Sequence, residues 1–327
     1  MTIPHSVAAL PCLPPLSRAL ADIDRVFGVR TLLDEATRPA SDHVERYYIA
    51  SERGYRRVHS PEGAMHLALS PSGSFDREDY RAQARQVAEL AVQRGAATVL
   101  ELGSGQGFNT QHLARALPGA RVQGLDLLAH HVTQASARAQ AAGLGNLSFR
   151  QGSFEPLALG APVDLILGVE ALCYARDVPA LARSIAAALT PGGALVIYDA
   201  FRTGPLQAMT PQMAQAVQLY EGVTAVEGGF RPLVVWTDAL QAAGLQVSTE
   251  DVTTQTLPGV RRLHTYGWRY FNDWKIRLTT RLFPRILRHN AVGALLGPYL
   301  VEGPQPGASE PGATGLSYQR LIATKPA

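Results

Sequence analysis

The segment VLELGSGQGFNT, residues 99–110, constrains the fold more than any other stretch of the chain. An apolar run leads into three glycines, Gly103, Gly105 and Gly107, and a helix-compatible sequence follows. A turn from a buried strand into a helix uses glycine because the backbone must take positive φ angles and approach a ligand closely. Asp126 ends the next apolar run, at the distance where an acid suits the paired hydroxyls of a ribose. The pattern therefore predicts a nucleotide-type ligand at the ends of parallel strands.

The rest of the chain repeats the alternation of apolar runs and helical periodicity. This alternation is typical of a parallel sheet with crossover helices, so we expect a doubly wound α/β fold whose mostly parallel sheet has about seven strands. The predicted strands are residues 97–103, 121–127, 147–152, 163–169, 194–201, 245–253 and 316–325, the last two forming a late pair.

Four segments are predicted along the chain. Residues 1–75 form an N-terminal cap region, with a helix over 17–35 and an irregular remainder; a helix over 76–95 opens an α/β core of residues 76–256. A helix over 237–244, with Thr237 as its N-cap, belongs to that core. A basic amphipathic insertion or lid at 257–313 interrupts the sheet, and residues 314–327 supply its final strand.

Composition excludes several classes of protein. The chain has 327 residues, 46% hydrophobic and 17% charged, which is too apolar for intrinsic disorder. A net charge of +3 gives no global nucleic-acid signature. Cys12 and Cys173 lie far apart, and no residues have metal-ligand spacing, so neither a disulfide framework nor a metal site is predicted. Without an apolar run of membrane-spanning length, we expect a cytoplasmic protein, with peripheral membrane contact left open.

The glycine spacing separates two kinds of nucleotide site. Phe108 stands where the nicotinamide fingerprint GxGxxG requires its third glycine, so an oxidoreductase is the less favoured alternative. The observed ExGxGxG resembles the first motif of class I S-adenosylmethionine-dependent methyltransferases, and LTPGGALVIYD at 189–199 resembles their fifth strand. The resemblance implies a Rossmann-like methyltransferase fold and S-adenosylmethionine as cofactor. The residues that it implies for cofactor binding are Glu101, Gly103, Ser104, Gly105, Gln106, Gly107, Asn109, Asp126, Leu127, Gly152, Ser153, Phe154 and Val169.

A second resemblance concerns the acceptor of the methyl group. EALCYA at 170–175 is similar to the Glu-Ala-x-Cys-x-Ala string of the sterol and tocopherol methyltransferase group, and Tyr47-Tyr48 and GAMHLAL at 63–69 resemble further elements of those enzymes. It implies methylation, on carbon or oxygen, of a small lipophilic acceptor such as a sterol, isoprenoid, tocopherol-like or polyketide-like molecule of lipid or natural-product biosynthesis. The candidate catalytic residues are Glu170, Tyr48, His66 and Tyr174.

Two alternatives stay open at this point. Glu170 can equally bind the cofactor or a backbone amine. The whole chain can also be a non-catalytic protein that binds S-adenosylmethionine or a lipid on the same fold.

Basic residues cluster between Arg261 and Asn290, where eight Lys or Arg accompany one acid, Asp273. Phe271, Trp274, Leu278 and Leu282 are predicted to share one apolar helix face. Three interpretations fit: a core-packed helix with a solvated basic face, a lid over the active site, or a contact with an anionic membrane surface through 261–290. The arginines also suit a phosphorylated acceptor such as a prenyl diphosphate. Nucleic acid is not an expected partner, and the sequence does not predict the oligomeric state.

Overall fold

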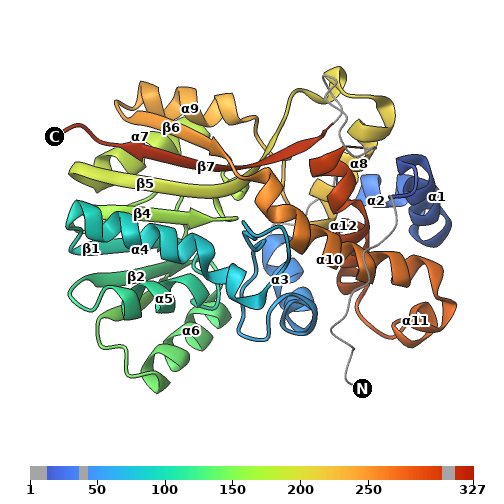
Figure 1. Cartoon of the computed structure of the whole chain (residues 1–327), viewed down its shortest axis with the longest axis horizontal. Coiled ribbons are helices and arrows are strands. Elements are labelled where there is room, and N and C mark those ends of the chain that lie inside the picture. The colour runs from blue at the N-terminus through green and yellow to red at the C-terminus, as the bar shows by residue number, and fades with distance from the viewer. Residues whose placement is uncertain (1–12, 37–42, 304–313) are drawn as a thin grey trace.

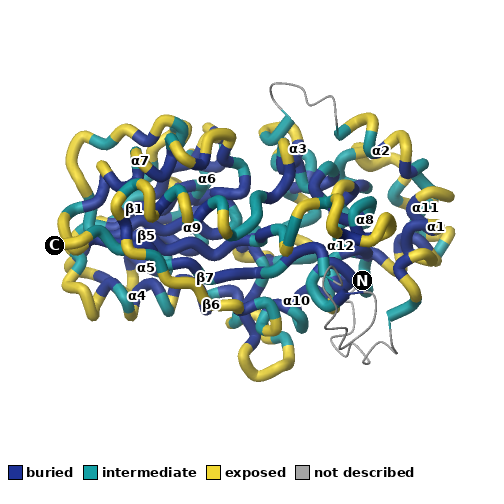
Figure 2. The backbone as a smooth tube through the Cα atoms, turned by 90° about the horizontal axis from the view of Figure 1, so that it is seen from above, coloured by how far each residue is buried: buried dark blue, intermediate teal, exposed yellow. Residues whose placement is uncertain are grey.

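The computed structural model describes residues 13–36, 43–303 and 314–327. A seven-stranded sheet occupies one end of the molecule and a group of helices the other (Figure 1, Figure 2). The strand order is β3-β2-β1-β4-β5-β7-β6, parallel except for β7, which is antiparallel to β5 and β6. This confirms the predicted doubly wound fold. The strands are β1 (Thr98–Leu102), β2 (Arg121–Asp126), β3 (Leu147–Gln151), β4 (Val163–Val169), β5 (Leu189–Arg202), β6 (Gln246–Asp251) and β7 (Leu316–Thr324).

Helices cover both faces of the sheet, which is why its inner strands are continuous apolar runs. Side chains of α4 (Ala82–Arg94) and α5 (Phe108–Ala116) pack on one face, and those of α7 (Val178–Ala188) and α9 (Leu233–Ala242) on the other. Helix α6 (Ala129–Ala141) contacts the edge strand β3. Strand β4 is mostly buried and lies in the middle of the sheet, between the two layers of helices. Its carboxyl end therefore faces the space between these layers.

A second hydrophobic core lies beyond the strand ends, and we call the helices around it the helical lobe. Ile23, Phe271 and Leu296 are fully buried there. Within the described residues, no helix is long and apolar enough to cross a membrane. The lobe consists of α1 (Leu16–Phe27), α2 (Val29–Ala36), α3 (His43–Gly54), α8 (Pro211–Val223), α10 (Thr253–Asn272), α11 (Trp274–Thr279) and α12 (Arg285–Glu302). Short helices complete the structure: η1 (Tyr55–His59), η2 (Arg77–Arg81), η3 (Leu172–Tyr174) and η4 (Leu206–Ala208).

Three local predictions are wrong. The helix over 17–35 is two helices, because Gly28 at φ 74° turns the chain between them. The region from 43 to 59 is helical rather than irregular, since its tyrosines pack inward at helical spacing, as buried Tyr47 shows. Helix α9 starts after Pro232, so Thr237 lies inside it and caps nothing. Residues 1–12, with Cys12, and 304–313 of the insertion lie outside the described residues.

The single apolar face predicted for the insertion is also wrong. Asp273 has an extended backbone, φ −108° and ψ 109°, which ends α10 and caps α11 through the Lys275 N–H. Phe271 is fully buried before this break, whereas Trp274, Leu278 and Leu282 are 62%, 57% and 95% exposed after it. The 3-4-4 spacing therefore extends over the end of α10, the short helix α11 and the turn that follows it.

Candidate functional site

A cavity of about 610 Å³ opens at the carboxyl ends of β1, β2 and β4, and we call it the strand-end cavity. Gly103 and Gly105 line it, with φ angles of 68° and 52°. A Cβ atom on Gly105 would lie 2.4 Å from the Met65 Cε atom, and one on Gly103 would lie 2.4 Å from the Ala171 Cβ atom. Glycine is therefore required both by the backbone conformation and by the space at this turn.

Asp126 lies at the end of β2 with its carboxylate held from two sides. Oδ2 accepts the Gly105 N–H at 2.7 Å, and Oδ1 accepts the Leu128 N–H at 2.9 Å. His131 Nδ1 lies 3.2 Å from Oδ1. A carboxylate offers about four acceptor positions, so these contacts orient Asp126 in the cavity wall and leave lone pairs for the hydroxyls of a ribose. Asp126 thus connects the glycine loop to the wall of the strand-end cavity.

Buried polar atoms beneath the loop have no partner in the described structure. Asn109 Nδ2 donates to Glu101 Oε1 at 3.1 Å, while Glu101 Oε2 and Ser104 Oγ accept nothing. Burial raises the pKa of Glu101 to about 8. An unpaired buried carboxyl oxygen costs free energy unless a donor reaches it. Glu101 lies beneath the glycine turn, whereas the turn itself and the oriented carboxylate of Asp126 line the cavity. These lining residues fit the methionine and ribose parts of S-adenosylmethionine.

The predicted cofactor residues fall into two groups. Six line the strand-end cavity: Gly103, Gly105, Asp126, Leu127, Ser153 and Phe154. The others lie behind the loop or along the strand, and of these Gly107 has a packing role, since a Cβ there would lie 2.6 Å from the Phe149 ring. The second group comprises Glu101, Ser104, Gln106, Gly107, Asn109, Gly152 and Val169.

A second cavity of about 310 Å³ lies between the strand ends and the helical lobe. Its lining is dominated by one residue type, so we call it the tyrosine cavity. Among the described residues that line it, Glu170 and Asp199 are the carboxylic acids, and none is Lys or Arg. Eight of the eleven tyrosines of the chain line it: Tyr47, Tyr48, Tyr55, Tyr174, Tyr220, Tyr266, Tyr270 and Tyr318.

Four residues line both cavities and form their shared wall: Tyr48, Met65, Glu170 and Tyr174. The Tyr48 and Tyr174 hydroxyl oxygens lie 3.0 Å apart, and Tyr174 also donates to the Thr224 carbonyl at 3.1 Å. The structure thus brings together three of the four candidate catalytic residues. His66 lines neither cavity; it is buried against Phe108, with Nδ1 3.0 Å from the Leu67 carbonyl oxygen.

Glu170 projects into the shared wall from the end of β4. Its φ of 47° is unusual for a residue with a side chain, and strained backbones of this kind are common at functional sites. Oε1 accepts the Leu67 N–H at 2.6 Å and the Tyr318 hydroxyl at 2.9 Å. Burial is the main cause that raises the pKa of Glu170 to about 8. A carboxyl group with a pKa in this range can serve as a general acid or base near neutral pH.

Sequence reasoning missed three residues of this site. Asp199, within β5, accepts the Cys173 and Ala200 N–H groups at 2.9 Å, and burial raises its pKa to about 7. Asp199 is the last residue of the LTPGGALVIYD string, so a signal for it was present in the sequence. Met65 belongs to the GAMHLAL string, but the sequence gives neither its role nor that of Tyr318, because both roles depend on which segments meet in space. No cluster of three or more His, Cys, Asp or Glu within the described ranges could hold a metal ion.

Comparison with known sequences gives the following relatives. A family model described as a methyltransferase domain matches residues 99–193. A trans-aconitate 2-methyltransferase from Deinococcus radiodurans is 36% identical over 132 residues, which cover 40% of this chain and 49% of the relative. The chain thus matches about half the length of that protein. An S-adenosyl-L-methionine-dependent Diels-Alderase, iccD of Talaromyces variabilis, is 25% identical over 236 residues, 68% of this chain and 79% of the relative.

Comparison with solved structures extends the likeness to most of the chain. The crystal structure of the [4+2]-cyclase SpnF superposes with a TM-score of 0.65 at 19% identity, covering 88% of this chain and 98% of the other. At that identity, the match concerns the fold. The match extends beyond the sheet and its flanking helices, since these alone are a smaller share of the chain.

Proposed function

Because the chain carries a class I S-adenosylmethionine-dependent methyltransferase domain, we propose that it transfers a methyl group from S-adenosylmethionine to a small lipophilic acceptor, on oxygen or carbon. The main support for this proposal is the shared wall, at which the cofactor-sized strand-end cavity adjoins the aromatic tyrosine cavity. The residues that line both cavities are Tyr48, Met65, Glu170 and Tyr174. Methyl transfer requires donor and acceptor to meet in line, and this wall is where the two cavities meet.

The charges of the tyrosine cavity narrow the class of acceptor. Its described lining contains two carboxyl groups and neither Lys nor Arg. Diphosphates and carboxylates are normally bound by guanidinium or ammonium groups, so an anionic acceptor has no counter-charge here. Aromatic faces and hydroxyls favour a neutral or cationic lipophilic molecule. We therefore set aside the prenyl diphosphate that the basic insertion suggested.

Proton transfer at the acceptor falls to Glu170 in this proposal. When bound, S-adenosylmethionine supplies an electrophilic methyl group on a sulfonium sulfur. The ionised carboxylate of Glu170 accepts the proton of an acceptor hydroxyl, or the proton released after methylation of an alkene carbon. Tyr318, donating to Oε1 at 2.9 Å, holds that carboxylate in place. The hydroxyls of Tyr48 and Tyr174 position the acceptor against it.

A second candidate function is cyclisation of a polyunsaturated acceptor with S-adenosylmethionine bound but not consumed. It is favoured by the Diels-Alderase relative, whose match covers 68% of this chain, compared with 40% for the methyltransferase relative. A cavity lined by aromatic side chains also suits a folded polyene. In this case the strand-end cavity would have a structural role, and no methyl group would leave it.

One experiment separates the two functions. The chain is titrated with S-adenosylhomocysteine, with NAD as control, and then incubated with methyl-labelled S-adenosylmethionine and a lipid extract. The proposal expects micromolar binding of S-adenosylhomocysteine alone and label in an extracted lipid. Tight binding with no label in any product would support cyclisation. Absence of binding would refute the cofactor assignment.

Asp126→Ala tests the cofactor site directly. The substitution removes the acceptor for the Gly105 and Leu128 N–H groups as well as the ribose contact, so the affinity for S-adenosylhomocysteine should fall by roughly tenfold or more. Asp238→Ala, at an exposed position on α9, is the matched control and should bind normally. Equal affinities in the two variants would contradict the assignment of Asp126.

A further inference from the structure

An exposed apolar surface lies at the far end of the helical lobe. Trp274 and Leu278 are 62% and 57% exposed and stand four residues apart on α11, so they share one helix face. Leu282 and Phe283, 95% and 47% exposed, follow in the turn before α12. Single exposed apolar residues are ordinary, but four bulky ones within ten residues are not. We call these four residues the α11 surface.

Basic side chains surround the α11 surface. Between 273 and 285 the chain has four basic residues and one acidic residue. Asp273 caps α11, and Arg285 pairs with Glu35 at 3.0 Å. Lys275 and Arg281 are exposed and, within the part of the chain that the structure describes, contact no carboxylate. The apolar patch thus has a cationic border that is available to an anionic partner.

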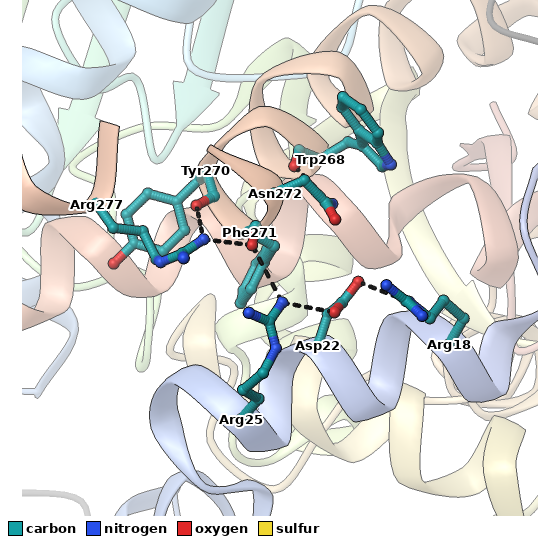
Figure 3. Close-up of polar contacts among 8 residues, drawn as sticks. All are labelled: Arg18, Asp22, Arg25, Trp268, Tyr270, Phe271, Asn272 and Arg277. Carbon is teal, nitrogen blue, oxygen red and sulfur yellow. Dashed lines mark hydrogen bonds and ion pairs between the residues drawn. The ribbon is translucent and has the colours of Figure 1, made fainter. Parts of the chain in front are cut away.

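Contacts between α1, α10 and α11 hold the α11 surface in position. At the C-terminus of α10, the Phe271 carbonyl accepts Arg25 from α1 at 3.2 Å and also Arg277 from α11 (Figure 3). Arg25 is oriented in turn by Asp22 at 2.7 Å. Trp268 points away from this polar cluster and is 42% exposed (Figure 3). The outward direction of α11 is therefore fixed by contacts on two neighbouring helices.

The same segment reaches the tyrosine cavity from its other side. Ile276, in the middle of α11, and Leu287, at the start of α12, both line that cavity. Trp274 and Leu278, two residues to either side of Ile276, are exposed to solvent. The α11 segment is thus a thin wall with the aromatic cavity inside and the α11 surface outside.

We propose that the α11 surface docks on a bilayer that contains anionic lipids. Trp, Leu and Phe enter the boundary between headgroups and acyl chains, while Lys275 and Arg281 meet the anionic headgroups. Docking places the tyrosine cavity next to the lipid phase, from which a lipophilic acceptor enters. The surface lies on the end of the molecule opposite to the sheet, so the glycine loop stays accessible to a water-soluble cofactor (Figure 1, Figure 2).

Vesicle binding tests the proposal without any assay of methyl transfer. The full chain is sedimented with vesicles of phosphatidylglycerol and phosphatidylcholine, and with vesicles of phosphatidylcholine alone, while Trp emission is recorded. We expect binding to the anionic vesicles, a blue shift in emission as Trp274 leaves water, and weaker binding at high salt. Lys275→Glu with Arg281→Glu should weaken binding by roughly tenfold or more.

Leu278→Glu with Leu282→Glu removes the apolar contact and should abolish binding. Val92→Glu, at a 68% exposed valine on α4, is the matched control and should bind as the unmodified chain does. All variants should keep their affinity for S-adenosylhomocysteine, which shows that they are folded. Failure to bind anionic vesicles, or binding that survives Leu278→Glu with Leu282→Glu, would overturn the proposal. So would a dimer of the unmodified chain that this double variant dissociates, because the surface would then bind a second copy.

Discussion

Among single residues, Gly105 is subject to three constraints at once. Its N–H holds Asp126, its φ is 52°, and a Cβ would meet Met65 of the shared wall at 2.4 Å. Gly105→Ala should therefore weaken S-adenosylhomocysteine binding by roughly tenfold or more, through about 1–2 kcal/mol of backbone strain and the displaced Met65. Calorimetric titration measures this.

Gly95→Ala is the control for backbone strain alone. Gly95 has a φ of 64° but no atom within 4 Å of its would-be Cβ, and it ends α4 far from the site. It should lose only the backbone-strain part of the stability that Gly105→Ala loses, about 1–2 kcal/mol, and keep its affinity. A loss of affinity in both variants would mean that general destabilisation, rather than the loop geometry, controls binding.

Glu170 should make the protein less stable as pH rises. Its pKa is raised by burial from 4.5 to about 8, so between these values the folded chain holds a proton that the unfolded chain has lost. The stabilising contribution of the protonated form is complete below about pH 4.5 and is lost as pH rises towards 8. Each such group gives a slope of up to about 1.4 kcal/mol per pH unit; Glu101 and Asp199 act in the same direction.

Glu170→Gln isolates this one group. Its amide oxygen can still accept from Leu67 and Tyr318, but it does not titrate. Denaturant unfolding between about pH 6 and about pH 7.5 should show a slope shallower by about 1 kcal/mol per pH unit than in the unmodified chain. If Glu170 is the base, methyl transfer should rise with pH through about 8 and be lost in the variant. Parallel stability curves for the two proteins would contradict the raised pKa.

At the scale of residues, the sequence predicts a site residue only when the residues that define its role lie close together in the chain. The glycine loop and Asp126 are defined by spacing within 24 residues, so the motif located both. Met65 meets Gly105 and Tyr318 meets Glu170 across 40 and 148 positions of the chain. No periodicity records such contacts. His66 is the opposite case. It belongs to the GAMHLAL string and was therefore a candidate, but it is buried and lines neither cavity.

At the scale of elements, α10 and α12 pack closely because α10 contains Gly267. A Cβ there would lie 2.5 Å from the Leu295 nitrogen and 2.8 Å from the Ala291 oxygen, both backbone atoms of α12. Gly267→Ala should therefore force the helices apart and destabilise the protein by about 2 kcal/mol or more. Denaturant unfolding measures this, and the binding of a lipophilic probe to the tyrosine cavity, which Gly267 lines, should change with it.

Gly259→Ala is the matched control on the same helix. Its would-be Cβ has only ordinary contacts, the nearest at 3.9 Å from Ala68. Because alanine is the better helix former, this variant should be neutral or up to about 1 kcal/mol more stable. Equal effects at the two positions would show that helix propensity, and not the helix crossing, decides stability here.

Element type was predictable wherever a strand or helix has its own periodicity and its own stop. Gly95 ends α4 in the left-handed conformation, as the sequence predicts. The break in the basic insertion could not be predicted, because Asp273 can either continue a helix or cap a new one. Here the Phe271 carbonyl accepts from Arg25 and Arg277, and these contacts favour the end of α10 at this point. Helical periodicity continued across that break by chance, which is why four apolar residues were assigned to a single face.

At the scale of the whole molecule, one strand joins three of the hydrophobic cores. In β7, Leu316 belongs to the core of the helical lobe, Tyr318 to one face of the sheet and Leu321 to the other face. Helix α10 leaves the sheet next to β6 and enters the lobe. The tyrosine cavity, lined by both parts, depends on this junction. We therefore expect the sheet and the helical lobe to unfold together.

Cofactor binding tests this coupling, because the ligand contacts mainly the sheet. At a hundredfold excess over its Kd, S-adenosylhomocysteine should stabilise the chain by about 3 kcal/mol, a rise of about 4 °C in Tm for this length. Trp236 is buried in the sheet core, whereas Trp268 and Trp274 lie in the lobe. Trp236→Phe and the double variant Trp268→Phe with Trp274→Phe therefore report the two parts separately by fluorescence. In each variant, the ligand should raise the Tm by the same amount relative to that variant without ligand. If only the Tm reported by Trp236 rises, the lobe unfolds independently of the sheet. In that case the acceptor cavity opens without loss of the cofactor.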